Sequence, residues 1–243
     1  MRARQAAQSS FIGGDATDLA SAPVILDDDR RRAAAAVRRL GNAVAGRVLE
    51  PELLARIAEV LEPLSAEAET ARVRDKSTDM SGNERWEHFR LTGRMPEPPG
   101  DGEVIHFDPG SLVGGVYNPF GMGASHHREG DEAVTRLTLT APFEGPPARV
   151  HGGVVAAIVD EAMAALMPTL QTVAFTGELR IRLVAGAPMG VPVEFRARLL
   201  DRQGRKLIVG CTGSGDAGVF VEAEATFIEF DPARFAGLTG GEA

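Results

Sequence analysis

Two glycines and one acid have the spacing of a site that attacks an acyl carbon. Gly152 and Gly153 precede an apolar, alanine-rich stretch, and Asp160 follows seven residues after Gly153 on the same helical face. Glycines at a helix start let a ligand approach the backbone, and the first N–H groups there carry partial positive charge. Such donors stabilise a carbonyl oxygen that gains negative charge. A carboxylate on an apolar helix is costly to bury unless it is solvated, hydrogen-bonded or functional.

The elements around this segment predict one helix wrapped by a curved antiparallel sheet. Residues 152–167 form the expected helix, which Pro168 ends, and its many alanines suit a helix closely surrounded by protein. Strands are expected in the stretches 134–139, 175–184, 191–200, 206–214 and 219–230. Turn residues between the later stretches favour successive hairpins. The sequence therefore predicts an α+β fold.

A different pattern precedes these strands. Asp27 to Asp29 supply a helix start, Pro51 suits the first turn of a second helix, and apolar residues recur at helical spacing in both. We expect two helices in a hairpin. The proline- and glycine-rich residues 95–102 mark a boundary. The predicted division is a flexible leader at 1–26, a helical extension at 27–95, the main domain at 104–231 and a flexible tail at 232–243.

Composition excludes several classes of protein. Hydrophobic residues make up 44% of the 243, enough for a core. The net charge is −8, and residues 101–243 carry 11 basic against 18 acidic residues, a poor surface for nucleic acid. The lone Cys211 cannot form an internal disulfide. No stretch predicts a membrane span or a secretory signal, so we expect a cytoplasmic protein.

The segment VHGGVVAAIVDEAMA resembles the His-Gly-Gly…Asp signature of hotdog-fold acyl-CoA thioesterases of the phenylacetyl-CoA thioesterase type. The resemblance continues through VAFTGELRIRL and LLDRQGRKLIVGC and covers about residues 104–231, without the helical extension. It implies a hotdog fold that assembles as a homodimer or a dimer of dimers. It also implies hydrolysis of an acyl-CoA to a carboxylic acid and coenzyme A. No metal or cofactor is expected, apart from coenzyme A as part of the substrate.

The resemblance assigns catalytic roles to three residues. Asp160 matches the acid that acts as general base on water or as nucleophile. Gly152 matches the glycine whose N–H polarises the thioester carbonyl. Thr176 matches a hydroxyl residue that positions the water, and the resemblance implies that it comes from the neighbouring subunit.

Further residues match substrate-binding positions. The turn with Arg202, Arg205 and Lys206 corresponds to one that contacts coenzyme A, whose phosphates these charges suit. Asn118 matches a position that lines the acyl pocket. Glu144 stands where relatives have an amide, so either it takes part in the chemistry or that helper is missing. The full predicted substrate-binding set is His151, Gly153, Asn118, Glu144, Arg202, Arg205 and Lys206.

Alternatives remain open at this point. Glu161 could replace its neighbour as base, and His151 could brace its loop or transfer a proton. His126 and His127 read as an exposed hairpin turn without metal-ligand spacing. A hotdog hydratase typically has a His after the Asp, and no His follows Asp160. A non-catalytic acyl-CoA-binding protein is the remaining rival. Few aromatic residues favour an aliphatic acyl group.

Overall fold

The computed structural model describes residues 28–75 and 84–231. The predicted leader 1–26 and tail 232–243 lie outside the described residues. The elements in chain order are α1 (Asp28–Gly46), α2 (Pro51–Glu69), α4 (Glu84–Thr92), β1 (Ser125–Glu129), β2 (Glu132–Thr138), the 3₁₀-helix η2 (Ala141–Phe143), α5 (Gly152–Ala164), β3 (Ala174–Leu183), β4 (Pro192–Gln203), β5 (Lys206–Gly215) and β6 (Gly218–Glu229).

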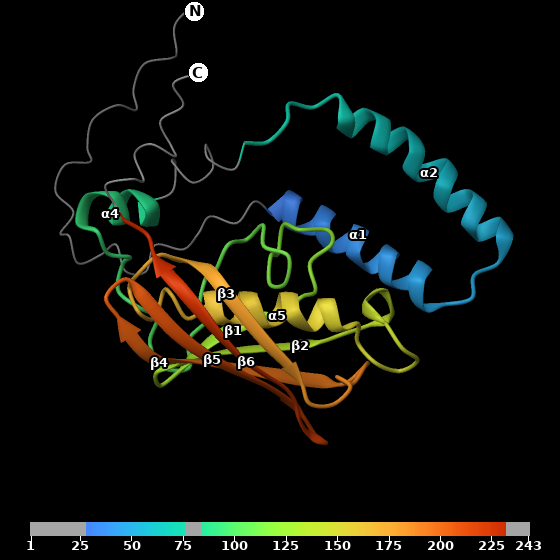
Figure 1. The fold of residues 1–243 in the computed structure, drawn as a ribbon. Coiled ribbons are helices and arrows are strands. Elements are labelled where there is room, and N and C mark those ends of the chain that lie inside the picture. The colour runs from blue at the N-terminus through green and yellow to red at the C-terminus, as the bar shows by residue number, and fades with distance from the viewer. Residues whose placement is uncertain (1–27, 76–83, 232–243) are drawn as a thin grey trace, which may run out of the picture.

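The strands of the described residues form one six-stranded antiparallel sheet in the order β1-β2-β4-β5-β6-β3. The sheet curves around α5, which lies along its inner face (Figure 1). Strand β3 comes first after the helix but pairs with β6, so it forms one edge of the sheet. The predicted α+β arrangement is confirmed.

The core lies between α5 and the inner face of the sheet. Side chains alternate along β4 and β5, so that Phe195, Leu207 and Val209 are fully buried beneath the helix. The helix contributes Ile158 and Met163 to the same core. Because one face of α5 is buried, core packing sets the orientation of this helix about its own axis.

Three elements were not predicted from the sequence: α4, β1 and the short 3₁₀-helix η2. The helix α4 lies in a stretch with little helical periodicity, and β1 contains the two histidines expected in an exposed turn. That expectation was wrong, because His126 is buried beneath α5 and pairs with Thr135 of β2. Strand β1 was not predicted because a polar residue, His126, occupies its inward position. A hydrogen-bonding side chain is needed there.

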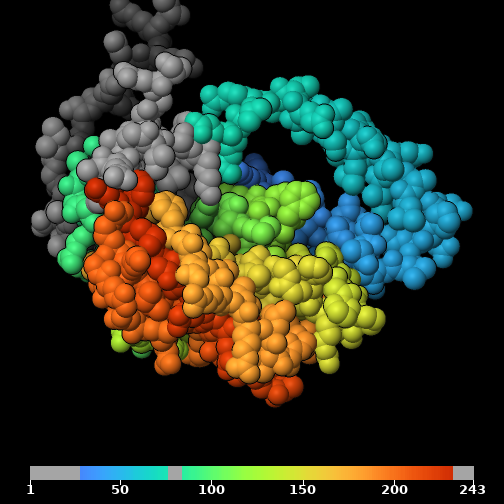
Figure 2. Space-filling view, viewed as in Figure 1, coloured from blue at the N-terminus to red at the C-terminus, as the bar shows by residue number. Residues whose placement is uncertain are grey.

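The helical extension contains the two predicted helices, but they do not pack against each other as a hairpin. Helix α1 rests on the main body through the buried Ala34, and Asn42 accepts a hydrogen bond of 2.9 Å from Thr140. Helix α2 runs back above α1 (Figure 1), but it buries no residue, and Figure 2 shows open space between it and the body. Helix α4 packs its Phe89 with Met95 and Val173 against the end of the sheet. The predicted division at residue 95 stays a prediction.

Candidate functional site

The start of α5 offers one free backbone donor. His151 occupies the N-cap position, and its Nδ1 accepts a hydrogen bond of 3.0 Å from the Gly153 N–H. His151 therefore braces the helix start, and the Gly153 N–H is already occupied. Within the described residues the Gly152 N–H has no acceptor. It remains available to a ligand at the positive end of the helix.

The loop before α5 is held by its own hydrogen bonds. The Glu144 carboxylate accepts a bond of 2.7 Å from the Ala148 N–H, and the His151 N–H donates to the Phe143 carbonyl at 2.9 Å. Ala148 has a positive φ of 60°, which a tight loop requires. The Glu144 side chain thus shapes the loop that presents Gly152.

Asp160 pairs with Thr176 inside one chain. The Thr176 hydroxyl donates to Asp160 Oδ1 at 2.7 Å, and the carboxylate is half-buried while the hydroxyl is exposed. A bulge between Thr176 and Glu178 interrupts the pairing of β3 with β6 at this point, and such bulges redirect side chains. The resemblance implied that Thr176 comes from the neighbouring subunit, but here it reaches Asp160 from the same chain, in which β3 follows α5.

Gly152 and Asp160 are too far apart to serve the same thioester within one chain. They are eight residues apart on α5, which corresponds to about 12 Å along the axis at 1.5 Å per residue. A carbonyl carbon and its oxygen are bonded neighbours, so the donor and the base must lie within a few ångströms of each other in a working site. At 100° per residue, Gly152 and Asp160 also lie about 80° apart around the helix, so they share neither a direction nor a location.

Glu161 is the buried acid of this helix. It is 8% exposed and accepts hydrogen bonds from Ser111 Oγ at 2.7 Å, Val113 N at 3.0 Å, Gly114 N at 2.7 Å and His126 Nε2 at 3.3 Å. Burial by itself raises the pKa of this carboxyl, but the four donors outweigh it and the pKa lies below its ordinary value of 4.5. A carboxylate so enclosed cannot act as the base on a substrate. Sequence reasoning missed this role, because the four donors lie far from Glu161 in the chain.

In the predicted basic turn, Lys206 is the one cation whose side chain has no hydrogen-bond or ion-pair partner among the described residues. Arg202 pairs with the Glu229 carboxylate at 2.9 Å, and Arg205 donates to the Glu229 carbonyl. Lys206 is exposed and forms no ion pair within the described part of the chain. Of the three residues, Lys206 therefore has the side chain that is available to bind a phosphate.

Asn118 stabilises a loop. It lies in a turn, and its side chain donates to the Ser111 carbonyl at 3.1 Å and accepts from the Phe120 N–H at 2.9 Å. The structure gives it neither a strand position nor a contact with Asp160. Its expected place in an acyl pocket stays a prediction.

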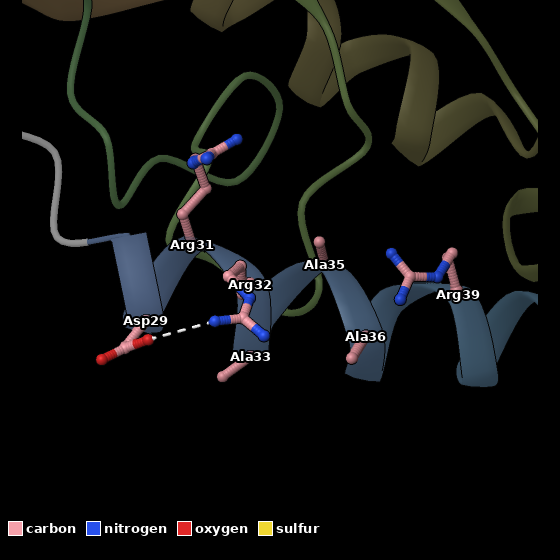
Figure 3. Close-up of a pocket in the computed structure, with 7 residues that line it drawn as sticks. All are labelled: Asp29, Arg31, Arg32, Ala33, Ala35, Ala36 and Arg39. Carbon is pink, nitrogen blue, oxygen red and sulfur yellow. Dashed lines mark hydrogen bonds and ion pairs between the residues drawn. The ribbon is translucent and has the colours of Figure 1, made fainter.

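A hollow of about 660 Å³ lies along α1, away from these residues (Figure 3). Arginines and alanines line it, and one Arg32–Asp29 ion pair of 3.5 Å crosses it. It shares no residue with the predicted site. In the described residues there is no group of three possible metal ligands, and no helix has the length and apolar character to cross a membrane.

Comparisons with known proteins match this region. Residues 148–219 match the sequence model of the thioesterase superfamily, a range that includes Gly152, Asp160 and Thr176. The acyl-coenzyme A thioesterase THEM4 of Mus musculus is 33% identical over 94 residues, or 38% of this chain and 40% of that protein. The same protein of Rattus norvegicus is 32% identical over 92 residues, covering 37% and 40%. The match thus spans less than half the length of these relatives.

A solved structure supports the fold over a longer range. The crystal structure of RHA08564, described as a thioesterase superfamily protein, has a TM-score of 0.63 and 23% sequence identity. The superposition covers 82% of this chain and 90% of that one, so it extends beyond the segment matched in sequence. The predicted resemblance and hotdog fold are confirmed: residues 148–219 match the thioesterase superfamily in sequence, and the chain shares its fold with this solved structure.

Proposed function

We propose that this protein hydrolyses acyl-CoA thioesters to a free carboxylic acid and coenzyme A. The observation that carries the proposal is the 2.7 Å bond from Thr176 to the half-buried Asp160 on a helix whose Gly152 N–H is free. The mouse and rat relatives bear the name of this activity, which supports the choice of substrate class. Lys206 would meet a phosphate of coenzyme A.

In the proposed reaction Asp160 acts as the general base. The carboxylate takes a proton from a water molecule that the Thr176 hydroxyl helps to orient, and the water oxygen attacks the thioester carbon. The carbonyl oxygen gains negative charge and is stabilised by the Gly152 N–H. The carbon–sulfur bond then breaks, and the thiolate of coenzyme A leaves and takes up a proton.

The working site would lie between two copies of the chain. Asp160 and Gly152 are about 12 Å apart on one helix, so a two-fold axis near Ala156 would place Gly152 of one copy beside Asp160 of the other. Small residues lie at positions 153, 157 and 164 on the partly exposed face of α5, which permits two helices to approach closely. The dimer supplies a reason for the separation of donor and base.

Thiol release from a panel of acyl-CoA esters tests the proposal. The panel contains short, medium and long straight chains and aryl esters, and free thiol is measured with a disulfide reagent. Burial raises the pKa of the Cys211 thiol to about 12, so the folded protein adds little background. We expect Asp160→Asn to lower kcat at least ~100-fold, the scale of a lost general base.

Controls separate catalysis from binding. A loss of turnover in Asp160→Asn indicates a catalytic role only if this variant retains the melting temperature and oligomeric state of the wild type. Tight binding of the esters by the wild type, without release of thiol, would instead identify a non-catalytic acyl-CoA-binding protein. Near-normal turnover by Asp160→Asn would remove Asp160 from the mechanism.

A further inference from the structure

The loop of residues 110–118 lies between α1 and α5 and is bonded to both helices (Figure 1). On its inner side the loop and β1 surround Glu161 with two backbone N–H groups, one hydroxyl and one imidazole. We call these residues the Glu161 cradle: Ser111, Val113, Gly114 and His126. Glu161 is 8% exposed, so the cradle shields its carboxylate from bulk solvent.

Within the cradle, the Gly114 backbone lies very close to the His126 imidazole. A Cβ on Gly114 would lie 2.5 Å from His126 Nε2, closer than side chains come to one another. His126 is itself held by Thr135, whose Oγ1 lies 2.8 Å from Nδ1 and which is fully buried. The position of the cradle relative to β1 and β2 is therefore fixed within narrow limits.

On its outer side the same loop is held by α1. Arg38 Nη2 donates to the Asn118 carbonyl at 2.9 Å, and the Arg30 guanidinium lies 4.9 Å from the centre of the Tyr117 ring. Both arginines come from the helical extension, which lies outside the segment matched in sequence to the family. A chain of contacts thus runs from α1 through the loop to Glu161.

We propose that Glu161 and Arg38 are positioning residues for the base. Neighbouring residues on a helix point about 100° apart, so Glu161 faces the cradle while Asp160 faces Thr176. Anchoring Glu161 fixes the rotation of α5, and with it the direction of the Asp160 carboxylate. Arg38 anchors the loop that supplies the cradle. The kinetic part of this proposal rests on the proposed thioesterase activity.

Kinetics of three arginine variants test the role of α1. Arg38→Met keeps the aliphatic stem but removes the donor, and we expect kcat to fall about tenfold with little change in KM, as misplacement of a catalytic group does. Arg38→Lys restores a cationic donor and should recover most of kcat. Arg39→Met is the matched control, because Arg39 is exposed and makes no hydrogen bond within the described residues. An Arg38→Met enzyme with wild-type kcat would overturn the proposal.

Hydrogen exchange gives a second readout that does not need activity. In Arg38→Met and Glu161→Gln, amides of residues 153–164 should exchange faster than in the wild type and in Arg39→Met. Faster exchange confined to residues 110–118 would show that the loop moves without α5, and would overturn the proposal. If the wild type releases no thiol while α5 still responds, the thioesterase assignment fails and the coupling of the two helices stands. If Glu161→Gln fails to fold, the exchange rates of Arg38→Met still test the proposal.

Discussion

At the scale of single residues, His151 divides the backbone donors of α5 between the protein and a ligand. Its side chain occupies the Gly153 N–H and leaves that of Gly152 free. The backbone of His151, with φ −61° and ψ 133°, lies in the region that a residue before proline prefers. Proline is also well tolerated at the first position of a helix. The free donor can therefore be deleted without breaking the helix.

Gly152→Pro should remove the oxyanion donor while the fold persists. We expect kcat to fall by roughly 10²–10³, the loss seen when one such donor is removed. Gly152→Ala is the control: its Cβ would press on Leu183 Cδ1 at 3.1 Å, as the proline ring would, but the N–H remains. Steady-state kinetics of the two variants check the prediction. Equal losses in both would indicate crowding and not a missing hydrogen bond.

Glu161 should contribute to stability at neutral pH and lose that contribution in acid. Its folded pKa lies below 4.5, so unfolding at neutral pH releases a carboxylate from its hydrogen bonds, whereas below the folded pKa both states are protonated. We expect Glu161→Gln to be less stable than the wild type at neutral pH. The difference should shrink as the pH falls below 4.5.

Urea unfolding of both proteins across this range measures the effect. Comparing the two proteins cancels the titration of all other carboxyl groups that the substitution leaves unchanged. A stability difference that stays constant from neutral pH into acid would show that the carboxylate charge is not what the cradle stabilises.

At the scale of elements, the two helices of the extension differ in what they contribute. Ala34 of α1 is buried against the body, whereas Leu61 of α2 is 37% exposed and α2 buries nothing. Both helices have apolar residues at helical spacing, so their sequences do not distinguish them. The difference arises from the residues that each helix meets in the fold.

Ala34→Asp should destabilise the protein by about 1–3 kcal/mol, because it buries a charge without a partner. Leu61→Asp should change the free energy of unfolding by less than ~0.5 kcal/mol, as exposed substitutions do. Chemical denaturation measures both. A large loss in Leu61→Asp would mean that α2 is covered in solution.

Sequence periodicity predicted the elements that bury a regular apolar face. Strands β4 to β6 and helix α5 have such patterns, and the edge strand β3 has a weaker one in which Leu179 and Ile181 are half-buried. Strand β1 was missed because its inward residue is His126, a polar side chain that is acceptable there only because Thr135 and Glu161 lie beside it. Partners so distant in sequence leave no local signal.

For the site, residue spacing identified α5 as the helix that carries Gly152 and Asp160. It did not reveal that these two residues lie too far apart along the helix to act on one thioester. Asp160 and Thr176 come together as side chains from adjacent elements. The roles of Glu144 and Asn118 as loop braces could not be predicted, because their partners are backbone groups whose positions depend on loop conformation. Arg202 and Arg205 read as free charges until β6 placed Glu229 next to them.

At the scale of the whole molecule, the two faces of the sheet differ in chemistry. The outer face of β2 and β4 carries interleaved charges, with Arg196 paired to Glu129, Glu132 and Glu194. The edge strand β3 instead exposes apolar side chains: Leu183, 54% exposed, lies on the side of α5, and Phe175, 56% exposed, lies on the opposite face from Thr176. An edge strand with apolar neighbours is suited to association with a second chain.

Leu183→Glu should therefore weaken the proposed dimer, because it places a charge on the edge beside Gly152. Leu200→Glu is the matched control, with a side chain on β4 that is 47% exposed. Light scattering during size-exclusion chromatography should show a shift of Leu183→Glu towards the monomer, while Leu200→Glu keeps the wild-type mass. Thiol release should fall with dimer content, since in the proposed site the donor and the base come from different copies. A monomeric Leu183→Glu with full activity would show that one chain completes the site, despite the separation of Gly152 and Asp160 along α5.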